Sequence, residues 1–378
     1  MSKYVLKASD IEPLLEGLTI LGTGGGGSPK LGRAILENDI IKKNRQIIIE
    51  TPEAISDNAT IVSGGIMGSV AFLDKLDTEK LIECWEEKFE LIEAIELMSQ
   101  YIGKKIDHVV PFEVGALNTP VILSLAARMG ISVVDGDSLG RSAPETQMAS
   151  FLAHGISLTP MPLVDTEGNK IIVVGQKEAT FADEVGRFVI AKENVGMGAN
   201  SHYAMTGAQL KQSVIPNTIT KALRIGKSLL EARKSGSDTI QAVVEELDGL
   251  KMFEGKISSL QAEDKGGFYI TNVRLEGKKE FEGTEAKLVI KNETMALWVN
   301  DKLKSVFPDL VCMLDTKTGS GVLSTDLKMG KNLVLVGTPC HSRRREGLMN
   351  PDIAKVFGGD RYGCPELRFV EMEELNRR

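Results

Sequence analysis

Apolar and polar positions along the first 160 residues predict helices and strands in alternation. Apolar residues at helical spacing from Ile11 to Leu18, after a Ser9–Glu12 capping box, predict a helix that ends near residue 21. Apolar runs predict strands over residues 46–50, 59–62, 106–111 and 131–134, and amphipathic patterns predict helices over residues 30–42, 78–100, 118–128 and 144–153. This alternation indicates an α/β domain with a largely parallel sheet.

The pattern changes near residue 165, where short apolar runs separated by Gly, Asn or Asp become common. These runs predict strands over residues 170–174, 256–260, 267–275, 286–290, 311–314 and 333–336. Helical patterns over residues 208–234 and 238–247 interrupt them. We therefore predict an α/β domain over residues 1–165 and a β-rich, barrel-like domain with a helical insertion over residues 166–378.

A row of consecutive glycines follows the first predicted helix: Gly24, Gly25, Gly26 and Gly27. Glycine loses more backbone freedom on folding than other residues, so such a row favours a loop whose bare N–H groups approach a ligand. Ser28 and Pro29 then predict the start of the next helix, whose positive end suits an anion or a polarised carbonyl oxygen. The alternative is a glycine-rich turn that serves close packing only.

The same loop matches the spacing of a dinucleotide-binding fingerprint at Gly22, Gly24 and Gly27. That fingerprint requires a strand that runs into the first glycine, and here the sequence predicts a helix. A nucleotide-binding oxidoreductase is therefore the least favoured function.

Polar and glycine-rich stretches follow three of the predicted strands. They comprise residues 63–68, Glu113 and residues 135–141. In open α/β sheets the ligand crevice lies outside the carboxyl ends of the strands. We therefore expect these stretches to meet at one edge of the sheet, with the glycine loop beside them if the fold brings it there.

The candidate catalytic and binding side chains come from these stretches. Glu113, Asp135 and Asp137 could act as a general base, accept ring N–H groups of a substrate or ligate a cation, whereas Asp135 and Asp137 could also only cap the turn and the next helix. Arg141 offers a planar fork for a substrate carboxylate, and its alternative is an ion pair with Glu145. Asn118 is either a helix N-cap or a ligand contact.

Composition excludes several classes of function. The net charge is −7, and no stripe of Lys and Arg with interleaved aromatic residues indicates nucleic-acid binding. The four cysteines lack metal-ligand spacing, and the histidines form no zinc motif. No apolar run has the length of a membrane span and no signal peptide precedes the first helix, so we expect a cytoplasmic protein without membrane partners.

Several motifs occur in an order that resembles the S-methyl-thiohydantoin desulfurase family, which is associated with hydantoinase/oxoprolinase proteins. They are the sequence LGTGGGG at residues 21–27, PFEVG at 111–115 with Asn118, VDGD at 134–137 with Gly140 and Arg141, and GTPCH at 337–341. The resemblance covers most of the chain. It implies a Rossmann-like, three-layer α/β domain followed by a β-rich domain.

The resemblance also implies a function, namely a hydrolase that acts on an S-methyl-thiohydantoin or a hydantoin-like cyclic ureide and releases a thiol by water attack. We expect Asp137, Glu113 and His341 to be catalytic, with His341 the one histidine in a family motif and a structural histidine as its alternative. Substrate contacts are expected from the four glycines, Asn118, Asp135 and Arg141. A rival hypothesis is a non-catalytic accessory subunit of a hydantoinase/oxoprolinase partner. Homo-oligomerisation is expected, while cofactor and metal dependence stay open.

Overall fold

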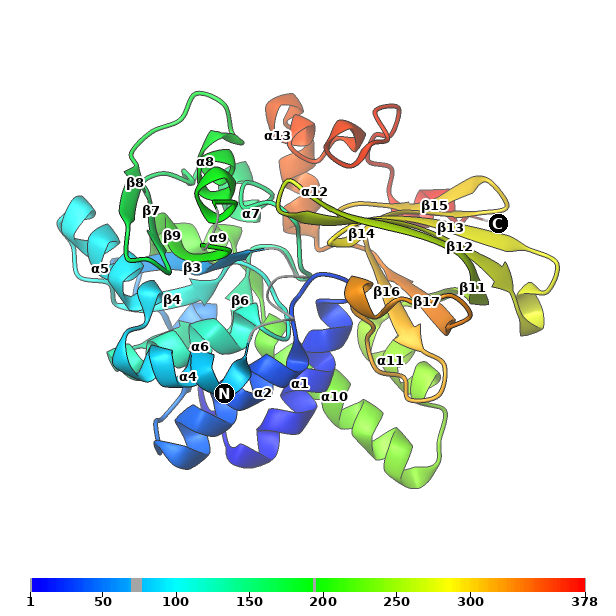
Figure 1. Ribbon diagram of the computed structural model, residues 1–378, viewed down its shortest axis with the longest axis horizontal. Helices are drawn as coiled ribbons and strands as arrows, with labels where there is room; N and C mark the ends of the chain where they lie inside the picture. Colours follow the sequence, from blue (N-terminus) through cyan, green and yellow to red (C-terminus); the bar gives the residue numbers. More distant parts are fainter. Residues whose placement is uncertain (1, 69–76, 193–194, 378) are drawn as a thin grey trace.

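A mixed β-sheet forms the larger part of the structure, a computed structural model that describes residues 2–68, 77–192 and 195–377 (Figure 1). Its strands, in spatial order, are β1 (Lys3–Val5), β2 (Ile48–Glu50), β5 (Ser132–Val134), β4 (His108–Pro111), β3 (Thr60–Gly68), β9 (Met197–Thr206), β7 (Met161–Asp165) and β8 (Lys170–Val173). Strands β2, β5, β4 and β3 are parallel, and the remaining pairs are antiparallel. The predicted α/β class is confirmed, and the Rossmann-like description stays a prediction.

Strand β3 differs from its prediction in a way that matters for the site. It continues to Gly68, so the glycine-rich segment after Val62 is strand and not loop. The antiparallel partner β9 binds this segment from Ser63 to Gly68, and β9 was not predicted. The polar residues of β9 interrupt the apolar pattern by which a buried strand is recognised, and this is why the sequence did not predict it.

Helices cover both faces of the sheet, and Figure 1 shows α6 and α8 on opposite faces. The described helices up to residue 247 are α1 (Ile11–Leu21), α2 (Pro29–Glu37), α4 (Thr78–Glu87), α5 (Glu90–Ile102), α6 (Asn118–Met129), α7 (Ser150–Ala153), α8 (Phe181–Ile190), α9 (Gly207–Ser213), α10 (Thr218–Ser235) and α11 (Thr239–Leu247). The single helix predicted over residues 78–100 is wrong, because Lys88 and Phe89 are extended and separate α4 from α5. The helix predicted over residues 144–153 is mostly loop, and only α7 is helical.

The glycine loop lies between two helices, as the sequence predicted. Helix α1 enters it and α2 leaves it, with Pro29 in the first turn and Ser28 at the N-cap. The Ser28 side chain makes no capping hydrogen bond. Helix α10, from the middle of the chain, packs on α1 so closely that a Cβ on Gly226 would lie 1.7 Å from the carbonyl oxygen of Pro13. Residues beyond 165 thus complete the α/β part, and the division at residue 165 stays a prediction.

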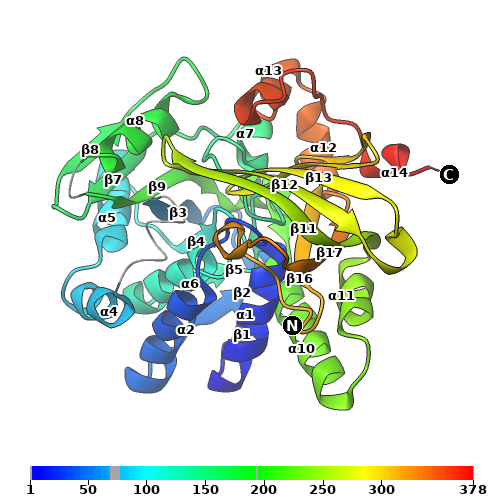
Figure 2. The same cartoon turned by 45° about the vertical axis from the view of Figure 1, so that its right-hand side comes forward.

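A second, curled antiparallel sheet follows, as predicted for the β-rich part (Figure 2). Its strands, in spatial order, are β15 (Lys302–Val306), β14 (Glu293–Val299), β13 (Glu285–Lys291), β12 (Phe268–Gly277), β11 (Leu250–Lys265), β17 (Asn332–Thr338) and β16 (Leu310–Asp315). Register shifts interrupt several of its strand pairs, and such irregularities increase strand bend and twist. The short helices α12 (Ser342–Leu348), α13 (Pro351–Lys355) and α14 (Met372–Leu375) follow the last strand.

The two sheets are joined through the glycine loop. The Thr23 hydroxyl accepts a hydrogen bond from the N–H of Met313, and the Gly24 N–H donates to the carbonyl of Val322. The Gly24 carbonyl in turn accepts from the N–H and the hydroxyl of Ser324. These hydrogen bonds therefore connect the loop, which belongs to the α/β part, to residues of the curled sheet and its loops.

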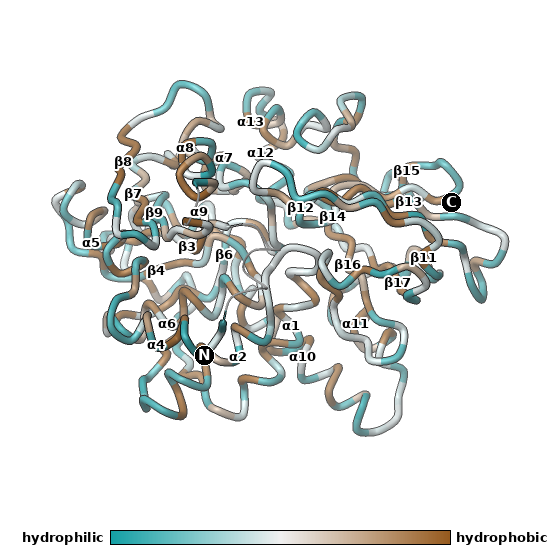
Figure 3. The backbone as a smooth tube through the Cα atoms, viewed as in Figure 1, coloured by the Kyte–Doolittle hydropathy of each residue, from teal (hydrophilic) through white to brown (hydrophobic). Residues whose placement is uncertain are grey.

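Apolar side chains fill the space between the helices and both sheets. Figure 3 shows hydrophobic stretches in the strands of both sheets and hydrophilic stretches in the outer loops. Within the ranges that the structure describes, no helix combines the length and apolar character needed to cross a bilayer.

Candidate functional site

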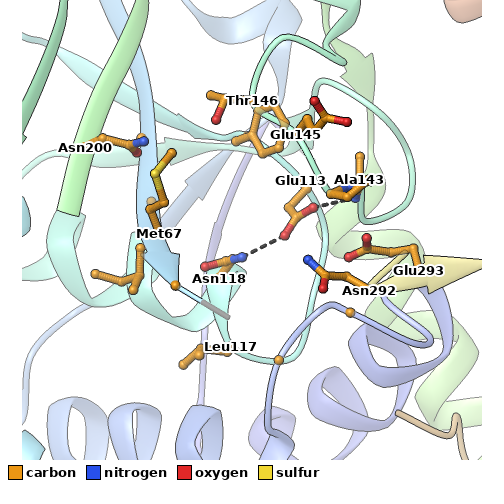
Figure 4. A pocket seen from close by; sticks show the side chains of 18 of the residues that line it. Met67, Glu113, Leu117, Asn118, Ala143, Glu145, Thr146, Asn200, Asn292 and Glu293 are labelled. Carbon is orange, nitrogen blue, oxygen red and sulfur yellow. Dashed lines mark hydrogen bonds between the residues drawn. The ribbon is translucent and has the colours of Figure 1, made fainter. Parts of the chain in front are cut away.

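A small cavity lies where the glycine loop, the mixed sheet and the curled sheet meet (Figure 4). We call it the first cavity; its volume is about 70 Å³. Its lining comes from the end of β3, the loop after β4, the loop before α7, strand β9 and the β13–β14 turn. The lining includes the backbone of Gly25 and Gly27 and the side chains of Glu113, Asn118, His202 and Glu293.

Two glycines that line this cavity have N–H groups with no assigned hydrogen-bond acceptor among the described residues. The Gly24 and Gly26 N–H groups donate to the carbonyls of Val322 and Gly22, so they hold the loop together. Gly25 and Gly27 line the cavity, and within the described residues no acceptor is assigned to either N–H. Of the four glycines predicted to contact a substrate, Gly25 and Gly27 line the cavity, and Gly24 and Gly26 hold the loop together; the predicted substrate contact stays untested.

Glu113 reaches the cavity from the carboxyl end of β4. Its Oε1 accepts a hydrogen bond of 2.7 Å from the Asn118 side-chain amide, and its Oε2 accepts one of 2.6 Å from the N–H of Ala143 (Figure 4). Burial, then the nearby Glu293 carboxyl, raises the pKa of Glu113 well above its ordinary value. Asn118 is the first residue of α6 and Leu117 is its N-cap, so the capping alternative for Asn118 is wrong. The Asn118 Oδ1 atom has no partner among the described residues.

Glu293 was not predicted, and it completes the site from the curled sheet. It begins β14 directly after Asn292, whose left-handed backbone makes the turn from β13. The side chain is 1% exposed, and burial raises the pKa of Glu293 to about 7 although the Arg141 guanidinium lowers it. Its carboxylate occupies the space that a side chain on Gly25 would need, since a Cβ there would lie 2.0 Å from Oε1. One acidic residue at a hairpin turn gives no sequence signal for this role.

His202 is the second residue that sequence reasoning did not assign. It lies in the middle of β9, is 1% exposed and lines the first cavity. Burial lowers the pKa of His202 to about 3, so the ring is neutral at physiological pH. Its Nδ1 atom has no hydrogen-bond partner within the described ranges. Together with Asn118, it leaves buried polar atoms that a bound ligand could satisfy.

The side chains of Asp135 and Asp137 accept hydrogen bonds from backbone N–H groups. Asp135 accepts hydrogen bonds from the N–H groups of Ile219 and Thr220 and so caps the start of α10. The carboxylate of Asp137 accepts from the N–H groups of Leu139 and Gly140, and burial raises its pKa to about 7. Neither residue lines the first cavity. Asp137 thus caps the turn, as its alternative predicted, whereas Asp135 caps α10 and not the next helix; the predicted site roles of both stay untested.

Arg141 is buried and holds the two sheets together. It donates to the backbone carbonyls of Ser142, Asp309 and Thr294 and lies over the Phe307 ring at 4.8 Å. The predicted alternative, an ion pair with Glu145, is wrong: the Glu145 carboxylate pairs with Lys291 at 2.6 Å and with Arg361. The carbonyl contacts occupy donors that a substrate carboxylate would need.

His341 lines a different cavity, which we call the second cavity. It is the N-cap of α12, where its Nδ1 accepts a hydrogen bond of 3.2 Å from the N–H of Arg343. The second cavity has a volume of about 160 Å³ and shares no lining residue with the first. The predicted group of Glu113, Asp137 and His341 is therefore not gathered around one cavity. Among the described residues, no three His, Cys, Asp or Glu side chains are arranged to hold a metal ion.

Comparison with known proteins agrees with this architecture. The family model described as the S-Me-THD-like N-terminal domain matches residues 9–175, and the model of the S-Me-THD-like C-terminal domain matches residues 177–371. An X-ray structure of a protein from Chromobacterium violaceum has the same fold, with a TM-score of 0.76, 22% identity and coverage of 97% of this chain and 99% of that chain. No curated protein matches the chain.

Proposed function

Because the chain belongs to the S-Me-THD-like family, we propose that it is a hydrolase acting on an S-methyl-thiohydantoin or a related hydantoin-like cyclic ureide. The observation that carries the proposal is the pair of buried carboxyl groups, Glu113 and Glu293, at one small cavity beside two glycine amides.

The pair supplies both a base and an acid. Burial and mutual repulsion disfavour two ionised carboxylates, so one proton remains on the pair near neutral pH. The ionised member accepts a proton from water, and the protonated member donates one. The proposal does not depend on which residue holds the proton, because interacting groups titrate as a pair.

In the proposed reaction, the water oxygen forms a bond to the ring carbon that bears sulfur, and the carbon–sulfur bond then breaks. One water proton ends on the ring nitrogen and the other on the departing methanethiolate, so the products are a hydantoin and methanethiol. The N–H groups of Gly25 and Gly27 are suited to a carbonyl oxygen of the ring. The unpartnered Asn118 Oδ1 is suited to a ring N–H.

The size of the first cavity supports a small ligand. Its volume of about 70 Å³ corresponds to roughly five water-sized groups. A five-membered ring is of that size. The hydrogen bonds of Thr23 and Gly24 hold the glycine loop in place on one side of the cavity. A fixed loop favours one small ring over larger substrates.

The test is to incubate purified protein with an S-methyl-thiohydantoin and, separately, with a hydantoin, and to measure thiol release and ring opening in independent assays. The proposal expects thiol release without ring opening. Ring opening without thiol release would instead make the protein a cyclic-ureide hydrolase. Binding without turnover of either compound would overturn the enzymatic proposal and favour the accessory-subunit hypothesis.

A further inference from the structure

The second cavity combines positive charge with the absence of carboxylates. Its walls come from the 139–141 loop, the start of α10 and the ends of β16 and β17. The polar lining includes Lys221, Arg141, Thr218, Cys340 and His341, and none of the residues that line it is Asp or Glu. The remaining walls are mostly apolar: Leu21, Leu139, Ile215, Pro216, Pro308, Leu310 and Pro339.

Two cationic residues, Arg141 and Lys221, line this cavity, and Arg141 already donates to three backbone carbonyls. Lys221 lies one turn into α10, and no ion pair or side-chain hydrogen bond connects its ammonium to another described residue. Burial lowers the pKa of Lys221, while Asp248 and Glu246 act on it only from a distance. Glu246 pairs instead with Arg224 at 3.5 Å. A partly buried ammonium without a counter-ion is costly unless a ligand supplies the charge.

His341 also lines this cavity and offers a second donor. Its Nδ1 accepts from the N–H of Arg343, so in the neutral ring Nε2 carries the proton. Burial and the Arg343 charge lower the pKa of His341, which keeps the ring neutral near pH 7. Cys340 adds no nucleophile, because burial raises the pKa of its thiol to about 12.

We propose that the second cavity binds a small aliphatic monocarboxylate, with its carboxylate on Lys221 and His341 and its carbon chain against the apolar wall. Because Arg141 already donates to backbone carbonyls, Lys221 and the neutral His341 are the groups that match one carboxylate. A phosphate dianion would need further donors, and the guanidinium of Arg141, which also lines the cavity, already donates to backbone carbonyls. This site is separate from the first cavity, so the proposal does not rest on the hydrolase function.

The histidine signals provide a direct test with butyrate as the probe. The chain has four histidines, of which His341 lines the second cavity and His202 lines the first. Titration of wild-type protein with butyrate, followed by ring-proton NMR, should shift the His341 signal in a saturable way and leave His202 unchanged. His341→Gln assigns the signal. The neutral isostere butyramide should bind at least about tenfold more weakly, because it lacks the charge.

A matched pair of variants tests the lysine. Lys221→Gln should weaken butyrate binding about tenfold or more, and Lys234→Gln, an exposed lysine of the same helix, should not change it. Thermal denaturation without butyrate checks that both variants fold.

Three outcomes would overturn the proposal: equal affinity of wild-type protein for butyrate and butyramide, a shift of His202 in place of His341, or tighter binding of inorganic phosphate than of butyrate. The last would assign the cavity to phosphate ligands. All three are measured on wild-type protein, so the test stands even if Lys221→Gln fails to fold.

Discussion

The two cavities use opposite chemistry within one fold. The first gathers Glu113 and Glu293, with burial raising the pKa of both carboxyl groups, whereas the second has Lys221 and no lining carboxylate. Both lie where the α/β part meets the curled sheet, and both take residues from each part. Ligand sites favour such boundaries, because two rigid surfaces can hold charged groups that neither could bury alone.

Arg141 lines the second cavity, and its charge also acts on the first. Its charge lowers the pKa of Glu293 on one side and of the Cys312 thiol on another. Its hydrogen bonds to carbonyls from both parts of the chain make it a structural element. An arginine after a strand end is therefore not by itself a ligand contact, because the carbonyl groups that its guanidinium binds decide its role.

The largest expected effect is a loss of turnover when Glu113 of the first cavity is replaced. Glu113→Gln keeps the side-chain shape but removes the proton-transfer group, so we expect turnover of an S-methyl-thiohydantoin to fall about a hundredfold or more. Steady-state thiol release measures this. Glu96→Gln, at an exposed position of α5, is the control. Unchanged turnover in Glu113→Gln would make Glu113 a structural partner of Asn118 and Ala143.

The next effect concerns stability and pH. The pKa of Glu293 is about 7 in the folded protein and about 4.3 in an unfolded chain, so between these values the folded state binds the extra proton. Stability from this proton is complete below about pH 4 and is lost as the pH rises through about 7. Glu293→Gln should therefore be more stable than wild type at pH 8 by up to about 3–4 kcal/mol, since one pKa unit corresponds to about 1.4 kcal/mol.

Urea unfolding of both proteins between pH 4 and 8 measures this difference, with Glu374→Gln at an exposed position as the control. Parallel pH profiles for wild type and Glu293→Gln would show that Glu293 is not protonated in the folded protein.

A smaller effect tests the glycine loop. In Gly25→Ala the new Cβ would lie 2.0 Å from Oε1 of Glu293, so that carboxylate must move. We expect turnover to fall about tenfold, because a small misplacement of a reacting group is costly. Gly175→Ala, where nothing lies within 4 Å of the added Cβ, is the control. Equal turnover in both variants would contradict a positioning role for Gly25.

The smallest expected effect is that of replacing His341, which tests whether the second cavity contributes to turnover. His341→Ala removes a cap of α12 and should lower stability by about 1 kcal/mol or less, with turnover within about threefold of wild type. Thermal unfolding and thiol release measure the two quantities. A hundredfold loss of turnover would instead support the predicted catalytic role of His341.

Local patterns in the sequence predicted two helices and the position of one site residue. The apolar spacing before Gly22 predicted α1, and Pro29 predicted the start of α2, because both signals act within a few residues. Glu113 was placed at a ligand-facing strand end because parallel strands share one edge of the sheet.

Only the tertiary structure selected the partners of those groups. Asp135 and Asp137 resembled Glu113 in sequence position, yet backbone amides of α10 and of the 138–140 turn occupy their carboxylates. Glu293 and His202 reach the first cavity from β14 and from β9, far from Glu113 along the chain. Such contacts depend on how two sheets pack, and a local pattern of apolar residues carries no information on that packing.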